Sequence, residues 1–501
     1  MTVVSSANLQ LALEDSPSLR SVIKSPEMLS REVLAGIVTA LALIPEVISF
    51  SFVSGVDPQV ALAASIVLGL VMSAFGGRPA MVTAAAGSIA LVIGPMVKTH
   101  GVGYILPAVV LAGIVQIGFG LLGMARLMRF IPRSVMIGFV NSLGILIFCA
   151  QVPHVLNAPW TVYPLFVLTV AIVLLVPRLT TLIPAPLIAI VVVTAIVMSG
   201  HLSVPHVGSE GAMTDFSGIT PLVVPLNLDT LRLIWPTALS VAFVGLLETL
   251  LTAKLVDEVT DTRSDKGRES WALGIANIVA GFFGGIAGCA MIGQTVVNVK
   301  IGGGRTRIST AAAAIMLLLL VTILSRLMAQ IPMVALAAVM MIVAIRTFNW
   351  HSVLPATLMR MPKSETVVLL LTMAVTVATG NLALGVAAGV LLAIVLFARR
   401  VAHVIRVERT SSEDGSTVHY AVYGPLFFGS SNDLVERFSY ASDPKDVTID
   451  LTHSQIWDAS SVAALDSLES KYRAKGGVIT FTGLDQRSLA FRGRLSGQLQ
   501  G

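Results

Sequence analysis

The feature that most constrains this chain is a series of long apolar segments, each bounded by polar or charged residues. A helix needs about 20 apolar residues to cross the hydrocarbon core of a bilayer, and fewer where it is interrupted. Charged residues make up 12% of the chain and hydrophobic residues 55%, whereas about a quarter of the residues in a soluble domain are charged. The sequence therefore predicts an α-helical polytopic membrane protein, with the lipid bilayer as its surroundings.

We distinguish fourteen apolar segments, seven on each side of a polar stretch at 201–230. An odd number of spans in each half gives the halves opposite orientations, which predicts two inverted repeats in a transmembrane domain at 31–402. The repeats cover about 31–200 and 231–402, after a cytoplasmic segment at 1–30. The predicted spans are 36–55, 59–76, 85–97, 103–124, 134–152, 161–177 and 184–200, then 232–255, 271–285, 290–300, 309–325, 331–346, 364–379 and 382–399.

The basic residues predict the orientation of these spans, because Lys and Arg favour the cytoplasmic side. With the N-terminus in the cytoplasm, the outer side receives Lys98, Arg232 and Arg326. We therefore expect a multi-pass protein of the inner (plasma) membrane with both termini in the cytoplasm. The inner side receives Arg20, Lys24, Arg31, Arg78, Arg126, Arg129, Arg133, Arg178, Lys254, Arg263, Lys266, Arg268, Lys300, Arg305, Arg307, Arg346, Arg360, Lys363, Arg399 and Arg400.

Two apolar segments in corresponding places of the two halves are broken by runs of tiny residues, 84–88 and 284–290. Such paired interruptions are the best sequence pointer to a transporter's binding site. A helix that begins in mid-bilayer leaves its first N–H groups unpaired and carries about half a positive charge there. Two such ends attract an anion, so the pattern predicts an anion transporter. The alternative is that Ala and Gly merely permit close helix packing.

The anion is expected between the N-termini of half-helices 3 and 10, the short spans at 85–97 and 290–300. Small residues let a ligand approach the backbone closely, and a hydroxyl or an amide adds specific hydrogen bonds. The predicted anion-binding residues are Ala86, Gly87 and Ser88 in one half and Gly293, Gln294 and Thr295 in the other.

After Arg400 the pattern changes, and 403–501 mixes charged residues with short apolar runs. Alternating apolar and polar residues predict strands at 418–423, 447–451 and 478–481. Helical pieces are predicted at 434–438 and 462–472. Alternation of strands and helices indicates a small α/β domain, which is cytoplasmic in the predicted topology.

In these features the chain resembles the sulfate permease (SulP) family of anion transporters, which includes bicarbonate and dicarboxylate carriers and the motor protein prestin. The tail resembles a STAS domain, shared with bacterial anti-sigma factor antagonists. The resemblance implies core and gate subdomains, a homodimer, elevator-like movement of the core against the gate, and a possible cytoplasmic protein partner for the STAS domain. It rests on Ile44 to Phe50, Ser54 to Pro58, Phe130 to Val135, Gly138-Phe139, and Asn277 to Gly285, in that order along the chain.

Two carboxylates, Glu46 and Glu248, lie within predicted spans, where an ionisable residue usually faces a polar cavity and carries function. Glu248 and Thr252 share one helix face. The resembling sodium-coupled bicarbonate carriers hold their cation with Asp and Thr at these two positions. Because desolvation disfavours an ionised carboxylate, the glutamate at position 248 favours H⁺ over Na⁺ as the predicted coupling ion. The alternative is a structural carboxylate bonded to its neighbours.

Glu46 follows Pro45, which frees a backbone carbonyl within the first span. We expect Glu46 either to line the anion pocket and take up a proton or to brace the broken third span. Phe50 is a plausible wall of that pocket.

In the tail, the resemblance places a regulatory phosphorylated serine at Ser460, although Asp458 and its neighbours are also ordinary helix N-caps.

The sequence thus predicts a secondary-active transporter that couples protons to an organic dicarboxylate such as fumarate. The alternatives are a sodium-coupled bicarbonate or sulfate transporter and an anion channel. We find no Walker motif, no His/Cys metal spacing and no nucleophile elbow. No enzyme, metal or cofactor is therefore predicted, and the coupling ion is H⁺ or, alternatively, Na⁺. No nucleic-acid partner is predicted either, because the basic residues are scattered at the ends of apolar runs and form no patch.

Overall fold

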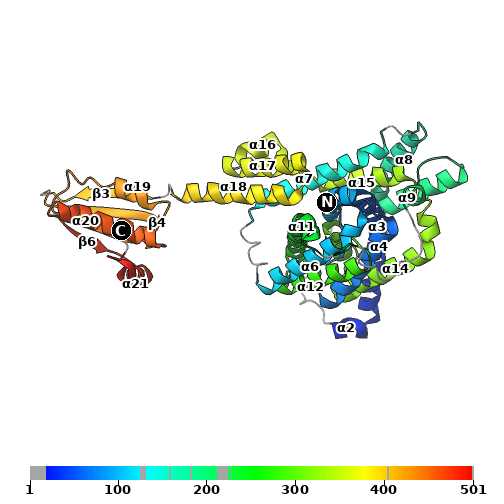
Figure 1. The fold of residues 1–501 in the computed structure, drawn as a ribbon, viewed down its shortest axis with the longest axis horizontal. Coiled ribbons are helices and arrows are strands. Elements are labelled where there is room, and N and C mark those ends of the chain that lie inside the picture. The colour runs from blue at the N-terminus through cyan, green and yellow to red at the C-terminus, as the bar shows by residue number, and fades with distance from the viewer. Residues whose placement is uncertain are drawn as a thin grey trace. The chain divides into compact units, whose positions relative to one another are not determined.

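The computed structural model describes residues 19–123, 131–156, 159–180, 183–211, 224–225, 227–402, 405–413 and 415–498. Its contacts divide the chain into a membrane unit that reaches Val390 and a C-terminal unit from Leu391 (Figure 1). The predictions for 1–18, Arg126, Arg129 and Phe130 lie outside the described residues.

Every predicted apolar segment overlaps a helix of the structure. In the first half these are α3 (Pro26–Ser54), α4 (Pro58–Phe75), α5 (Gly87–His100), α6 (Ile105–Leu121), α7 (Arg133–Gln151), α8 (Val162–Leu175) and α9 (Ala185–Ser199). In the second half they are α11 (Leu228–Thr260), α12 (Lys266–Phe282), α13 (Ile292–Val296), α14 (Arg307–Met328), α15 (Met333–Thr347), α17 (Lys363–Thr379) and α18 (Leu382–Ala402). Short helices α2 (Leu19–Lys24), α10 (Val207–Glu210) and α16 (Pro355–Arg360) lie between or before them.

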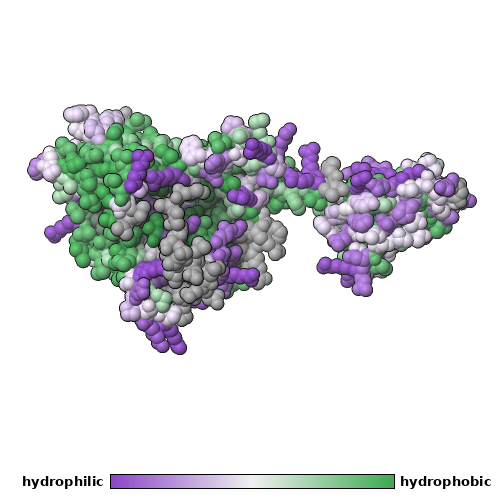
Figure 2. Space-filling view, turned by 180° about the vertical axis from the view of Figure 1, so that it is seen from behind, coloured by the Kyte–Doolittle hydropathy of each residue, from purple (hydrophilic) through white to green (hydrophobic). Residues whose placement is uncertain are grey.

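Among the described residues, seven helices are long and apolar enough to cross a membrane, namely α3, α4, α6, α7, α11, α14 and α18. The exact count of fourteen spans remains a prediction. Figure 2 shows hydrophobic side chains over much of the visible surface of the membrane unit, whereas the C-terminal unit is largely covered by polar ones. This difference matches the predicted division between a lipid-embedded part and a part in water.

Helix α3 begins earlier than the predicted position 36 because its polar N-terminal end is capped. The Ser25 hydroxyl accepts a hydrogen bond from Met28 N at 3.4 Å, and Pro26 occupies the first helical position. Both are favoured at helix starts. The predicted boundary at residue 31 therefore falls inside the helix.

The helices of the membrane unit form two bundles (Figure 1). In the first, which we call the core bundle, α12 packs on α4 and α6, α14 packs on α3 and α4, and α11 packs on α5 and α6. In the second, the gate bundle, α7 packs on α15 and α17, and α8 packs on α9 and α15. Each bundle contains helices from both halves of the chain, as the predicted core and gate subdomains require.

Two buried carboxylates that were not predicted from the sequence bind the halves together within the core bundle. Glu32 of α3 accepts hydrogen bonds from the backbone N–H groups of Arg305 at 2.7 Å and Thr306 at 3.1 Å, just before α14. Glu269 of α12 accepts from Gly77 N and from Arg78 N at 2.8 Å, in the loop after α4. Each carboxylate satisfies backbone donors that would otherwise be costly to bury. The core bundle is therefore tied as one body.

The C-terminal unit contains a four-stranded sheet in the order β3 (Arg406–Ser411), β4 (Thr417–Leu426), β5 (Asp446–Ile456) and β6 (Val478–Thr482). The first pair is antiparallel and the other two are parallel. Helices α19 (Ser431–Glu436), α20 (Ala459–Ala474) and α21 (Gln486–Leu495) complete it. The predicted strands and helical pieces are confirmed. β3 and α21 were not predicted, because both are largely polar, with Ser488 the single buried residue of α21.

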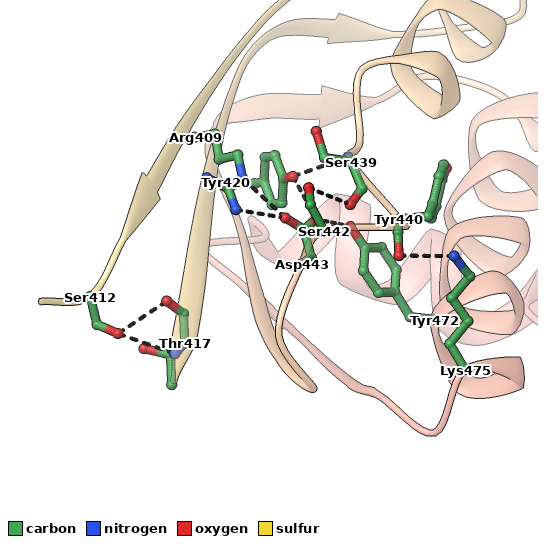
Figure 3. Close-up of polar contacts among 10 residues, drawn as sticks. All are labelled: Arg409, Ser412, Thr417, Tyr420, Ser439, Tyr440, Ser442, Asp443, Tyr472 and Lys475. Atoms are coloured by element: carbon green, nitrogen blue, oxygen red, sulfur yellow. Dashed lines mark hydrogen bonds and ion pairs between the residues drawn. The ribbon is translucent and has the colours of Figure 1, made fainter. Parts of the chain in front are cut away.

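A polar cluster in this unit is centred on Asp443 (Figure 3). The buried Asp443 carboxylate accepts from the guanidinium of Arg409 at 2.9 Å and from the hydroxyls of Tyr420 at 2.6 Å and Tyr472 at 2.5 Å. Burial and the hydrogen bond to Asp443 raise the pKa of the Tyr472 phenol far above its ordinary value, so it remains a donor at any physiological pH. The cluster joins β3, β4 and α20 through one carboxylate.

Candidate functional site

The two interruptions predicted from sequence are brought together by a short β-ladder. Strands β1 (Thr83–Ala85) and β2 (Gly288–Ala290) pair antiparallel, with Ala84 opposite Cys289. Two residues after each strand a helix begins, α5 at Gly87 and α13 at Ile292. The prediction of two interrupted segments is confirmed, but the sequence analysis did not predict that extended residues from the two halves would pair. The ladder brings the starts of the half-helices to one region.

Small residues are needed for the ladder to form. The alanines of β1 are fully buried, and a Cβ added at Gly288 would lie 2.3 Å from Ala84 O and 2.4 Å from Leu68 Cδ1. No side chain fits there without displacing the opposite strand. Close packing, the alternative offered for the small residues, is therefore also correct for this position.

Polar side chains satisfy the backbone groups that the ladder leaves free, since none can be left unpaired within the membrane. Asn277 Oδ1 accepts from Gly288 N at 2.8 Å, and Gln116 Oε1 accepts in turn from Asn277 Nδ2 at 2.8 Å. On the other side of β2, Thr249 Oγ1 accepts from Ala290 N at 3.0 Å. These amides and hydroxyls hold the interrupted helices in place. Their signal in the sequence was weak, because amides in spans commonly bond between helices.

Glu248 lies directly at the start of α5. Its carboxylate accepts a short hydrogen bond from Ser88 Oγ and a second from Cys289 Sγ at 3.1 Å. Ser88 and Cys289 are 1% and 0% exposed and Glu248 is 7% exposed. From the sequence, Glu248 is predicted to couple the cation and Ser88 to bind the anion. In the structure the two side chains touch, so both functions would share one place.

Thr252 lies one turn after Glu248 on α11, and its hydroxyl points to backbone carbonyls. Thr252 Oγ1 donates to Glu248 O at 2.8 Å and lies 3.4 Å from Ala290 O. The expected common helix face is therefore present, although Glu248 contacts Ser88 and Cys289 with its carboxylate. The hydroxyl retains acceptor lone pairs, which leaves the predicted cation role of Thr252 open.

Glu46, Phe50 and Gln294 form the opposite side of this region. The side chain of Gln294, in the first turn of α13, lies beside the half-buried carboxyl of Glu46. The ring of Phe50 packs against Gly87, where an added Cβ would lie 2.6 Å from Phe50 Cε1. Residues of α3 thus contact the first turn of both half-helices, as predicted for a pocket wall.

The other predicted anion-binding residues have distinct surroundings. Thr295 Oγ1 accepts from Val82 N at 3.0 Å and is thereby engaged in holding the segment before β1. Ala86 caps α5 with its carbonyl, which accepts from Ala90 N at 2.9 Å. A Cβ added at Gly293 would meet no described atom within 4 Å. Gly293 therefore borders open space, whereas the Thr295 hydroxyl already accepts a hydrogen bond from the backbone.

In the C-terminal unit, Asp458 is the N-cap of α20, since its Oδ1 accepts from Ser461 N at 3.0 Å. Ser460 is exposed in the first turn of that helix. The capping role is confirmed for Asp458, and modification of Ser460 stays a prediction.

The model of the sulfate permease family matches residues 29–163 and 158–372, and that of the STAS domain matches 409–490. The chain belongs to the sulfate permease family. It is 45% identical over 461 residues to YbaR of Bacillus subtilis, named as a candidate sulfate transporter, covering 91% of this chain and 95% of YbaR. It is 25% identical to the bicarbonate transporter BicA of Picosynechococcus, covering 84% and 82%.

Solved structures share the fold of this family member. The murine Solute Carrier 26 family member A9 anion transporter, in the inward-facing state, superimposes with a TM-score of 0.82 at 17% identity, over 99% of this chain and 92% of that one. The transmembrane domain of a cyanobacterial BicA superimposes with a TM-score of 0.64 at 24% identity, over 72% and 98%. Both likenesses show the overall fold that this chain shares with solved anion transporters.

Proposed function

We propose that this protein is a secondary-active anion transporter that couples uptake of an organic dicarboxylate, such as fumarate, to protons. The observation that carries the proposal is the contact of Glu248 with Ser88 at the start of α5. A helix N-terminus attracts anions, but an ionised carboxylate beside it already occupies that positive end and repels a second anion. Protonation of Glu248 removes the repulsion and frees the Ser88 hydroxyl for the substrate. Proton and anion then bind together.

Glu46 is proposed as a second group on the anion pocket. Gln294, whose side chain lies beside Glu46, comes from the first turn of the other half-helix, so an anion that recruits the amide of Gln294 changes the surroundings of Glu46. Ala86, Gly87 and Gly293 supply backbone groups that small side chains leave accessible. Phe50 forms the wall.

The movement proposed for transport is an elevator-type displacement of the core bundle, which carries the site, against the gate bundle. The hydrogen bonds of Glu32 and Glu269 support this idea because they hold loops and helices of the core bundle together. In a homodimer, the gate bundles would remain fixed at the interface.

The protein is proposed to reside in the inner membrane with both termini and the STAS domain in the cytoplasm, where the STAS domain binds a protein partner.

A second candidate is sodium-coupled transport of bicarbonate or sulfate. The names of YbaR and BicA support these substrates, and Glu248, Thr252 and the Ala290 carbonyl offer the oxygen ligands that hard cations prefer. An anion channel is disfavoured, because a passive pore needs no buried carboxylate at its anion site.

Uptake of labelled fumarate, sulfate and bicarbonate into proteoliposomes tests the proposal. We expect an inward proton gradient to drive fumarate accumulation, and Glu248→Gln to abolish the gradient-driven part while downhill exchange continues, because glutamine cannot carry the proton. Glu258→Gln, a change at an exposed residue of the same helix, is the matched control. Accumulation driven by sodium and not by protons would refute the coupling ion, and selective uptake of sulfate or bicarbonate would refute the substrate.

A further inference from the structure

An apolar cavity of about 230 Å³ lies between helices of the two bundles, away from the β1–β2 ladder. Its walls come from α3 and α14 of the core bundle and from α9 of the gate bundle, and include Ile44, Pro45, Ile190, Thr194, Leu324 and Met328. Almost all of the wall atoms are apolar. The cavity therefore lies where the two bodies of the proposed elevator meet.

Water is a poor occupant of this cavity. Thr194 is the one polar residue in the wall, and it is buried, with no hydrogen-bond partner for its Oγ1 among the described residues. A buried water needs two to four polar partners, which one hydroxyl does not supply. Apolar cavities stay dry and bind apolar molecules instead.

The cavity opens toward the surface that faces lipid. Three of its lining residues are exposed apolar side chains, Val191 at 58% and Met198 at 46% on α9, and Leu327 at 50% on α14. In a membrane, hydrocarbon chains surround these residues, so the cavity is continuous with the interface to lipid. The lipid hydrocarbon chains next to the opening are apolar, as are the walls of the cavity.

We propose that this cavity binds one hydrocarbon chain of a membrane lipid, which fills the space that α9, α3 and α14 leave between them. The lipid hydrocarbon chain supplies the dispersion contacts that an empty void lacks. It fills the void without interdigitated side chains, which would have to separate when the bundles slide. Pro45 lies in the cavity wall and the next residue, Glu46, contacts Gln294. The lipid hydrocarbon chain thus packs against the segment of α3 that reaches the anion site. The effect of the lipid on transport rests on the proposed function, whereas the binding of the lipid does not.

Photolabelling of the full-length protein in bilayers tests the binding. The probe is a phosphatidylcholine with a diazirine within one acyl chain, and adducts are mapped by mass spectrometry of peptides. We expect labelling of Ile190, Thr194 and Leu324 inside the cavity, and a several-fold loss of it in Ala195→Phe, which fills the opening. Val192→Phe, a change at an exposed residue of α9 that does not line the cavity, should leave the labelling unchanged.

Met198→Trp is a second filling variant if Ala195→Phe fails to fold. Absence of adducts inside the cavity, or labelling equal in the filling variants and in Val192→Phe, would overturn the proposal. In uptake measurements the filling variants should alter the turnover rate and Val192→Phe should not. Loss of transport in every variant, with the labelling pattern as expected, would refute the transport consequence and leave lipid binding intact.

Discussion

Gly87→Ala is the change for which the structure gives the clearest expectation. A methyl group at this position would lie 2.6 Å from Cε1 and 2.9 Å from Cζ of Phe50, well inside van der Waals contact. The ring is buried at 4% exposure, so it has little room to rotate away. Overpacking of a filled site costs about 1–3 kcal/mol. We expect Gly87→Ala to lower the free energy of unfolding by this amount.

Gly293→Ala is the matched control, because Gly293 occupies the first turn of the other half-helix and its added methyl would meet no described atom within 4 Å. Its cost should not exceed a few tenths of a kcal/mol, and as a better helix former Ala could even stabilise the turn. Stability is measured by thermal or chemical unfolding of the purified protein in detergent. The comparison separates crowding by Phe50 from a general need for glycine at half-helix starts.

Phe50→Leu in the Gly87→Ala background provides the decisive measurement. If contact with the ring causes the loss, the smaller side chain should recover part of it, and the double-mutant cycle should show a coupling of about 1–2 kcal/mol. Additive effects of the two changes, or equal losses in Gly87→Ala and Gly293→Ala, would refute the reasoning. The same variants in uptake assays should show a raised half-saturation concentration for Gly87→Ala, because the added methyl lies at a proposed anion-binding residue and displaces the Phe50 wall.

Two further expectations concern the C-terminal unit. Asp458→Ala should remove the cap of α20 and cost about 1 kcal/mol, seen as faster hydrogen exchange in peptides of that helix, whereas Ser460→Ala should leave exchange unchanged; equal effects would contradict the assignment of Asp458 as the cap. Asp443→Asn should destabilise the unit by about 2–3 kcal/mol because a buried acceptor of charged and phenolic donors is lost, measured by urea unfolding of the full chain. Asp446→Asn, at an exposed residue of β5, serves as its control, and similar midpoints for both variants would disprove the role of the Asp443 cluster.

Part of the site could be predicted from sequence because it follows from local composition. The runs 84–88 and 284–290 consist mainly of tiny residues and interrupt apolar segments in corresponding places of the two halves, and lipid tolerates broken backbone only where other parts of the protein satisfy it. Glu46 and Glu248 stood out because a carboxylate inside an apolar run is costly. Glu32 and Glu269 did not, because each lies among charged residues near the end of a span and looks solvated. Both are in fact 4% exposed or less.

The sequence by itself determined the helices of the membrane unit and the strand–helix alternation of the C-terminal unit, since hydrogen bonding in lipid and the period of apolar residues are local requirements. The tertiary structure alone decided which distant residues meet. Pairing of Ala84 with Cys289, contact of Ser88 with Glu248 and packing of Phe50 on Gly87 each join different elements. Such contacts depend on how helices from both halves pack around each other, and no periodicity within one segment specifies that geometry.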